Sequence, residues 1–433
     1  MKNKEVFTSR RQFVKSSAGL LAAVPFAAQA PPLDFFRNTS QKNVTLAIPD
    51  PNKSIIGQYG TWAAGLRPNP PKLSLRANRN KNLDAWRKEA LAKTVELVAS
   101  PPMGAVPKVT VVKKYAYDGL EIEELSWQLP FGRPTKAVFL KPAGAKKPLP
   151  AVLALHDHGG NKYFGWEKIV ATSDQPNPLM TAHREHYYEN QAWANELAKR
   201  GYAVLVHDVF AFGSRRVHYE DVAGITWGST KDTDRRDDQI DTPDEIATYN
   251  AWASDHEHIL SKSLFCGGTT WPGVVLAEDQ VALTILSQRP EVDPKRLGCS
   301  GLSGGGLRTV YLGGLDQRVK CAVPVGFMST WNDFLLHKAY THTWMVYTPL
   351  LPNYLEFPEI MGLRVPLATL VLNNSQDQLY TLPEMQKSDE ILREVYQIAK
   401  APEAYKTSFH DGEHKFDKAM QEEAFAWLDR WLA

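Results

Sequence analysis

The sequence is organised around the stretch Arg296–Gly306, RLGCSGLSGGG. Its first residues, Arg296–Ser300, are typical of a short buried strand, and a segment able to form a helix begins near Leu307. The chain must therefore turn sharply within Gly301–Gly306. Glycines two residues before and two residues after Ser303 suit this turn, because a Cβ atom at either position would collide with the neighbouring strand or helix. We predict that Ser303 has a strained backbone and lies at the positive end of that helix.

Short apolar runs recur on both sides of this turn. They are too short for buried helices and are apolar throughout, as expected for strands of a parallel sheet covered on both faces: Ala151–Leu155, Ala203–Val206, Val319–Val325 and Ala368–Leu372. Helical stretches alternate with them, at Asn190–Lys199, Ala277–Ser287 and Lys418–Leu432. Alternating residues around Asp118-Gly119 predict a hairpin ahead of these units. The pattern predicts an α/β fold: a mostly parallel central sheet with helices on both faces and N-terminal hairpin strands.

Ser303 is the candidate nucleophile. A serine hydroxyl reacts only when a base takes its proton and a carboxylate orients that base. Asp377 follows one later predicted strand, and His414 follows another, just ahead of the C-terminal helix. Serine, acid and histidine in this order are expected after a G-x-S-x-G turn. We predict the trio Ser303, Asp377 and His414, with His410 as the alternative histidine and Asp411 as the alternative acid.

An oxyanion formed during acyl transfer also needs backbone N–H donors. The residue after the nucleophile supplies one, here Gly304. The second donor is expected from the loop 156–160, HDHGG, which follows an early predicted strand. We predict His158 as this donor, with Gly159 and Gly160 as the alternatives.

These motifs carry a family resemblance. From about Lys108 to the C-terminus the chain resembles the α/β-hydrolase superfamily, and within it the bacterial branch described as acetyl-xylan-esterase-like or dienelactone-hydrolase-like. The resemblance depends on HDHGG at 156–160, RPEVDPKRLGCSGLSGGG at 289–306, and the loops around Asp377 and His414.

The resemblance implies roles for the predicted trio. Ser303 would be the nucleophile, Asp377 the acid and His414 the base, with no cofactor. The chain departs from dienelactone hydrolases, because serine replaces their nucleophilic cysteine and Leu302 precedes it. This departure argues against true dienelactone hydrolysis. The fold alone does not fix the substrate.

The chain divides into three predicted parts. Residues 1–30 have a basic start, an apolar run and small residues at the end, and SRRQFVK at 9–15 resembles the twin-arginine export motif. A general secretory signal or an uncleaved anchor is the alternative. Residues 31–107 form an N-terminal extension with one helix, and residues 108–433 form the catalytic domain. Two long lid insertions interrupt that domain, at about 213–272 and 327–364.

Composition excludes several classes of protein. The 433 residues include 50 Lys and Arg against 48 Asp and Glu, a net charge of +2, which argues against a nucleic-acid partner. The mean hydropathy of −0.35 argues against a multi-span membrane protein. Three scattered cysteines are too few for a disulfide framework, and we expect Cys299 and Cys321 to be buried thiols.

Two histidine pairs have the H-x-H spacing, His156/His158 and His256/His258. Metal sites use such pairs with a carboxylate. However, the first pair lies in the predicted oxyanion loop, and residues two apart do not share one face of a helix. We therefore predict no metal site and no cofactor.

Together these features predict an exported serine carboxylic-ester hydrolase in the periplasm or outside the cell. Its predicted substrate is a small-molecule or oligosaccharide ester, and the branch resemblance favours deacetylation of carbohydrate esters. A serine peptidase of the same fold, a non-catalytic carbohydrate-binding protein and a metal-assisted hydrolase are the alternatives. We expect no membrane insertion once the signal is removed, and the sequence gives no prediction of oligomeric state.

Overall fold

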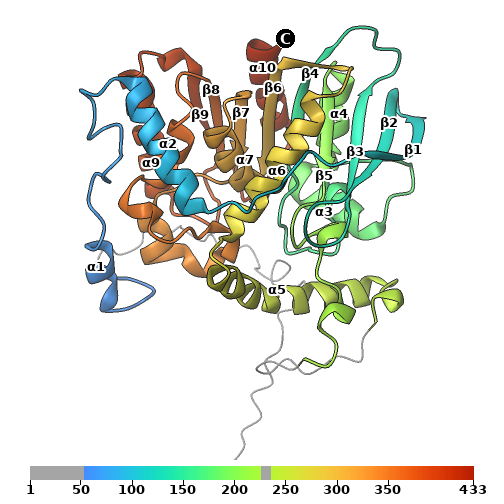
Figure 1. The fold of residues 1–433 in the computed structure, drawn as a ribbon, viewed down its shortest axis with the longest axis horizontal. Helices are drawn as coiled ribbons and strands as arrows, with labels where there is room; N and C mark the ends of the chain where they lie inside the picture. The colour runs from blue at the N-terminus through green and yellow to red at the C-terminus, as the bar shows by residue number, and fades with distance from the viewer. Residues whose placement is uncertain (1–52, 226–235) are drawn as a thin grey trace, which may run out of the picture. The chain divides into compact units, whose positions relative to one another are not determined.

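The computed structural model describes residues 53–225 and 236–433. These residues contain a nine-stranded sheet (Figure 1). The strand order is β1-β2-β3-β5-β4-β6-β7-β8-β9. The strands are β1 (Thr110–Tyr117), β2 (Leu120–Trp127), β3 (Thr135–Pro142), β4 (Leu149–Ala154), β5 (Ala203–His207), β6 (Val292–Leu302), β7 (Val319–Val325), β8 (Ala368–Asn374) and β9 (Tyr405–His410). The six strands from β5 to β9 along this order pair in parallel, whereas β1, β2 and β3 pair antiparallel and β3 meets β5 antiparallel. The predicted, largely parallel α/β sheet is confirmed.

The first two strands form the predicted hairpin. Tyr117 pairs with Leu120, and the two residues between them, Asp118 and Gly119, have φ angles of 51° and 78°. Two consecutive positive φ angles define the tight turn that best matches the twist of a hairpin, and Asp-Gly is a preferred pair for it.

Helices cover both faces of the sheet (Figure 1). In β4, Leu153 belongs to one core and its neighbour Val152 to the other, because successive strand residues point to opposite faces. The helices are α1 (Tyr59–Ala64), α2 (Leu83–Val98), α3 (Pro178–Tyr188), α4 (Trp193–Lys199), α5 (Pro243–Cys266), α6 (Trp271–Ser287), α7 (Gly304–Leu315), α8 (Phe357–Gly362), α9 (Leu382–Ile398) and α10 (Lys418–Leu432). Side chains of α6, α7 and α9 fill the first core, and those of α4 and α10 fill the second. No helix in the described ranges is long and apolar enough to cross a membrane.

The crossover between β4 and β5 differs from the sequence prediction. A single helix was expected at Asn190–Lys199, but the connection holds α3 and the shorter α4. Asn177 caps α3, and Pro178 occupies its first turn. Glu189 and Asn190 then both have positive φ angles, which ends the helix before α4 begins.

The first insertion contains α5, which runs across one end of the sheet (Figure 1). Thr242 and Glu245 form a reciprocal capping box at its start. Ile246, Tyr249 and Trp252 on this helix are buried in a hydrophobic cluster separate from the two main cores. These aromatic side chains are therefore a satellite core beneath the insertion. The second insertion consists of short turns, among them η6 (Asp333–Lys338), followed by α8.

The described part of the N-terminal extension packs onto the same body as the strands. The described residues, from 53 onward, belong to one compact unit. On α2, Trp86 is 1% exposed, belongs to the main core and donates from its indole N–H to the carbonyl of Leu73 at 2.8 Å. The predicted export signal at residues 1–30 lies outside the described residues.

The cysteines match the prediction made for them. Cys299 and Cys321 are fully buried in β6 and β7, Cys266 is exposed, and all three are free thiols. Burial raises the pKa of the Cys321 thiol to about 12, so this residue acts as a small apolar side chain.

The glycine that follows Ser303 by two residues gives a test of the fold. A Cβ atom on Gly305 would overlap the backbone carbonyl of Leu155. We expect Gly305→Ala to lower the free energy of unfolding by about 3 kcal/mol, because backbone cannot yield as a flexible side chain does. Gly65→Ala is the matched control, since its φ is −76° and its nearest atom would lie at an ordinary 3.4 Å. Equal unfolding free energies for the two variants, measured by chemical denaturation, would contradict this packing argument.

Candidate active site

Ser303 lies at the turn between β6 and α7 and has a φ of 58°, which only glycine adopts without strain. Its backbone N–H donates to the carbonyl of Val325 at 2.9 Å, which ties the turn to the end of β7. Gly301 and Gly305 both lie against the carbonyl of Leu155, where a Cβ atom would overlap it. The strained serine and the two required glycines form the geometry of a nucleophile elbow.

Asp377 and His414 meet although 37 residues separate them. His414 Nδ1 and Asp377 Oδ2 are 2.6 Å apart. Asp377 is only 2% exposed, and its other oxygen accepts from the backbone N–H of Leu379 at 2.9 Å. Both carboxylate oxygens are thus engaged, which fixes the orientation of the imidazole ring.

His414 and Ser303 both lie beside the carboxyl end of β7. Ser303 is bonded to the last residue of that strand, Val325, and the next residue, Gly326, packs against the His414 ring. A Cβ atom on Gly326 would be 2.9 Å from His414 Cε1, and its φ of 58° also favours glycine. The structure therefore brings the three predicted residues to one edge of the sheet.

The electrostatics of His414 suit a proton acceptor. Burial disfavours the imidazolium, but the Asp377 carboxylate outweighs it, and the net effect raises the pKa of His414 above its ordinary 6.5. Its Nε2 atom is buried and has no hydrogen-bond partner among the described residues. That nitrogen is available to a reacting hydroxyl.

The alternative histidine and acid lie elsewhere. His410 is the last residue of β9, and its Nε2 is 2.8 Å from Glu423 on α10. Asp411 Oδ1 accepts a long hydrogen bond of 3.4 Å from the hydroxyl of Ser375. The structure pairs neither of them with a member of the trio.

The loop after β4 brings a backbone N–H close to the elbow. A Cβ atom on Gly304 would lie 2.9 Å from the backbone nitrogen of His158. Gly159 instead packs against the side chains of Asp157 and His183, and Gly160 faces open space. Of the three amides considered from the sequence, that of His158 is the one in contact with Gly304.

The side chain of His158 is anchored to the first insertion. Its Nδ1 accepts from the Gly160 N–H at 3.1 Å, and its Nε2 lies 2.7 Å from Glu257 Oε1 and 2.8 Å from Lys162 Nζ. Lys162 forms an ion pair with the same carboxylate. Lys168 donates to the carbonyls of Asp157 and His158 at 2.8 and 3.0 Å.

These charges are buried, which makes their pairing necessary. Burial lowers the pKa of Lys168 to about 8 and opposes the ionised form of Glu257, but Lys162 and His158 hold the pKa of Glu257 below its usual range. Glu257 could not be predicted from the sequence, because it lies 99 residues beyond His158, whose side chain it holds. Its position in a polar helical stretch gave no signal of burial.

The histidine pairs considered as metal ligands do not converge. His156 Nδ1 contacts the Asp157 carbonyl at 3.0 Å, and the His256 ring stacks on Trp252 with centroids 5.2 Å apart. His158 is committed to Glu257.

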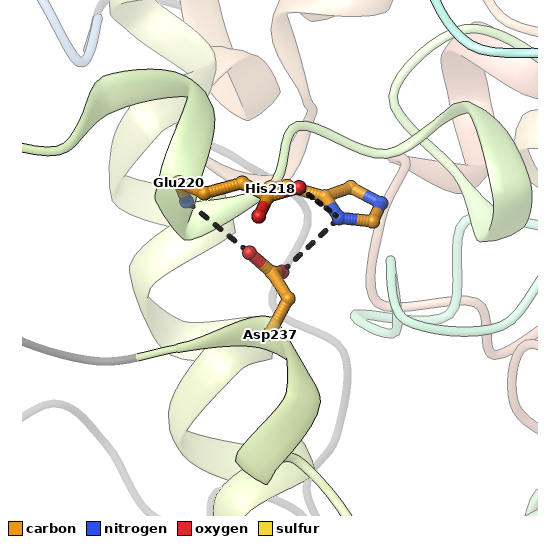
Figure 2. A group of neighbouring side chains, drawn as sticks. All are labelled: His218, Glu220 and Asp237. Carbon is orange, nitrogen blue, oxygen red and sulfur yellow. Dashed lines mark hydrogen bonds and ion pairs between the residues drawn. The ribbon is translucent and has the colours of Figure 1, made fainter.

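A different group, His218, Glu220 and Asp237, does bring possible ligand atoms within 4.8 Å of one another (Figure 2). The His218 Nδ1 atom lies 3.4 Å from Asp237 and 3.8 Å from Glu220. However, Arg133 already pairs with Glu220 at 2.8 Å, and Glu220 is 64% exposed. An arginine that neutralises this carboxylate accounts for the group as a surface ion-pair network, and we assign no metal to it.

Comparison with known proteins supports the fold. A family model described as "Abhydrolase family" matches residues 36–235, a range that includes the loop 156–160 and ends before Ser303. The chain has the α/β-hydrolase fold.

Known proteins are similar to this chain at low sequence identity. YtaP of Bacillus subtilis (strain 168), named as a hydrolase by inference, is 26% identical over 299 residues, which are 68% of this chain and 83% of YtaP. A Bacteroides fragilis NCTC 9343 structure, provisionally named an acetyl xylan esterase, is 18% identical with a TM-score of 0.60. The match covers 83% of this chain and 85% of the B. fragilis chain. A promiscuous CE15 esterase from a marine bacterial metagenome is 12% identical with a TM-score of 0.53. The match covers 89% of this chain and 97% of the esterase chain. At these identities the structures establish the fold.

The pairing of His414 with Asp377 predicts a measurable titration. We expect the pKa of His414, followed by NMR of its imidazole in 13C-histidine-labelled protein, to lie above 6.5 in the wild type. In Asp377→Asn the raising charge is lost while the burial remains, so the pKa should fall. Asp411→Asn removes a nearby acid that does not contact His414 and should leave the titration unchanged. A shift in the second variant and none in the first would contradict the assignment.

Proposed function

We propose that this protein is a serine carboxylic-ester hydrolase that uses Ser303, His414 and Asp377. The observation that carries the proposal is the 2.6 Å contact between His414 and Asp377, with the His414 ring next to Gly326 at the end of β7, the strand to which the Ser303 backbone is bonded. A serine, a histidine with one free nitrogen and a buried carboxylate are the minimum set for acyl transfer through an activated hydroxyl.

In the proposed reaction, Ser303 Oγ attacks the ester carbonyl while His414 Nε2 takes its proton. The Asp377 carboxylate stabilises the imidazolium that forms and holds its orientation. The backbone N–H groups of Gly304 and His158 donate to the oxyanion of the tetrahedral intermediate. His414 then protonates the leaving alcohol and activates the water that releases the acyl group from Ser303.

We further propose an acetyl ester of a carbohydrate as the substrate. Tyr340 and Trp344 in the second insertion are 74% and 36% exposed, and aromatic rings of this kind stack on sugar faces. The turn before Tyr340 is bonded to the loop of the catalytic acid, because Lys338 donates to the Gln378 carbonyl at 2.7 Å. The name of the B. fragilis protein, which refers to an acetyl xylan esterase, also favours a carbohydrate ester. The twin-arginine-like segment at residues 9–15 supports export to the periplasm or beyond.

Hydrolysis of p-nitrophenyl esters tests the proposal. We expect turnover of the acetate, a decline from acetate through butyrate to octanoate, and no effect of EDTA. Ser303→Ala should lower kcat by at least about 10³-fold while the unfolding curve is unchanged. Ser300→Ala is the matched control, because its hydroxyl donates to the Val323 carbonyl inside the sheet and does not face the substrate. Full activity in purified Ser303→Ala would overturn the mechanism.

The same assay separates the alternatives. A peptidase would hydrolyse p-nitroacetanilide in preference to p-nitrophenyl acetate, and a metal-assisted hydrolase would lose activity in EDTA. A non-catalytic carbohydrate-binding protein would hydrolyse none of these compounds.

The anchoring of His158 predicts the effect of a distant residue on catalysis. We expect Glu257→Gln to lower kcat for p-nitrophenyl acetate roughly 10- to 100-fold with little change in KM, because the oxyanion donor loses its fixed position. Asp255→Asn, an exposed change of the same type on the same helix, is the control and should have no effect. A raised KM with unchanged kcat in Glu257→Gln would contradict this role.

A further inference from the structure

A cavity of about 150 Å³ lies between the segment 164–177 and the helix α3. None of Ser303, Asp377 and His414 lines it. Its walls combine aromatic rings, small polar side chains and one cation, principally Phe164, Trp166, Thr172, Ser173, Asn177 and Arg184. A cavity of this size and mixed polarity can hold a small organic molecule as well as water.

Arg184 is the unusual member of this lining. It is 7% exposed, and its Nε donates to the backbone carbonyl of Met180 at 3.2 Å. Within residues 53–225 and 236–433 its guanidinium makes no further hydrogen bond and no ion pair. Burial lowers the pKa of Arg184, with only Tyr117 opposing the shift, yet an arginine remains charged at neutral pH.

The other buried arginines among the described residues have several partners each, and Arg364 donates to the backbone carbonyls of Gly313, Val319 and Ala368. Arg308 pairs with Asp279 at 2.7 Å and Arg215 with Glu278 at 2.6 Å. A buried cation without a counterion costs several kcal/mol unless polar groups compensate it. Arg184 lines the cavity, its Nε is bonded to Met180, and no acidic side chain among the described residues pairs with its two Nη groups.

The one acid that lines the cavity does not fill this role. Glu167 accepts from the backbone N–H of Gly165 at 3.0 Å and forms no ion pair with Arg184. Burial, together with the neighbouring Asp208 carboxylate, raises the pKa of Glu167 to about 7. The pair Glu167 and Asp208 would oppose a dianion in the cavity more strongly than a monoanion.

We propose that this cavity is a binding site for a small hydroxylated carboxylate, such as a sugar acid, held by Arg184. The planar guanidinium matches a carboxylate with two parallel hydrogen bonds. The rings of Phe164 and Trp166 suit the apolar face of such a molecule, and the hydroxyl and amide groups of Thr172, Ser173 and Asn177 suit its hydroxyls. The site is separate from the proposed ester-hydrolysing residues and does not depend on their activity.

Isothermal titration calorimetry on the full chain tests this site, with D-glucuronate as the probe, D-glucose as its neutral counterpart and inorganic phosphate as a second anion. We expect D-glucuronate to bind at least about tenfold more tightly than either of the others. Arg184→Gln should weaken D-glucuronate binding at least about tenfold, and Arg184→Lys should restore only part of it. Arg79→Gln, which removes an exposed arginine paired with Glu394, is the control and should bind as the wild type does.

A second variant keeps the test decisive if Arg184→Gln does not fold. Ala171 is half-exposed and lines the cavity, so Ala171→Phe narrows the cavity and leaves Arg184 in place. This variant should also abolish D-glucuronate binding, while Ser303-dependent ester hydrolysis is retained. The proposal is overturned by equal binding of D-glucose and D-glucuronate, by binding that survives both variants, by tighter binding of phosphate, or by no heat of D-glucuronate binding up to roughly 10 mM.

Discussion

The carbonyl oxygen of Leu155 lies against two glycines of the elbow, Gly301 and Gly305, with no space for a Cβ atom on either. This contact joins the end of β4 to the turn after β6, strands that are already neighbours in the sheet. It therefore fixes the loop that begins at His156 relative to Ser303. The proximity of the Gly304 and His158 backbones, and with it the proposed oxyanion site, follows from this close approach.

Buried charged side chains connect the loop after β4 to the first insertion. The loop after β4 carries two buried lysines, Lys162 and Lys168, and both hold its backbone or side chains in place. Glu257 on α5 supplies the opposing charge. The first insertion thus contributes both a satellite core and an electrostatic anchor for the residue that is proposed to bind the oxyanion. An isolated charge at this depth would be costly, so the insertion and the loop stabilise each other.

Local sequence rules predicted the hairpin and the sharp turn at Ser303, and the structure contains both. Strong steric requirements leave clear marks: two positive φ angles at Asp118-Gly119 need a particular residue pair, and the approach to Leu155 needs glycine. The choice of His414 over His410 followed from the Gly412 turn between them, and the structure pairs His414 with Asp377.

Long-range ion pairs could not be predicted in the same way. Glu257 and Lys162 lie 95 residues apart, and neither has a local pattern that marks it as buried. The sequence also does not reveal that Arg184 on α3 lacks an acidic partner among the described residues, because this depends on how the cavity is assembled. Sequence periodicity reports which face of an element is apolar, whereas buried charges are exceptions to that pattern.

The most direct test of the account is a crystal structure of the protein after reaction with a serine-directed phosphonate. The account predicts a covalent bond from phosphorus to Ser303 Oγ, with the phosphoryl oxygen within hydrogen-bond distance of the backbone nitrogens of Gly304 and His158, and His414 Nε2 adjacent to Ser303 Oγ. Modification of another residue, or a phosphoryl oxygen directed away from both nitrogens, would contradict it.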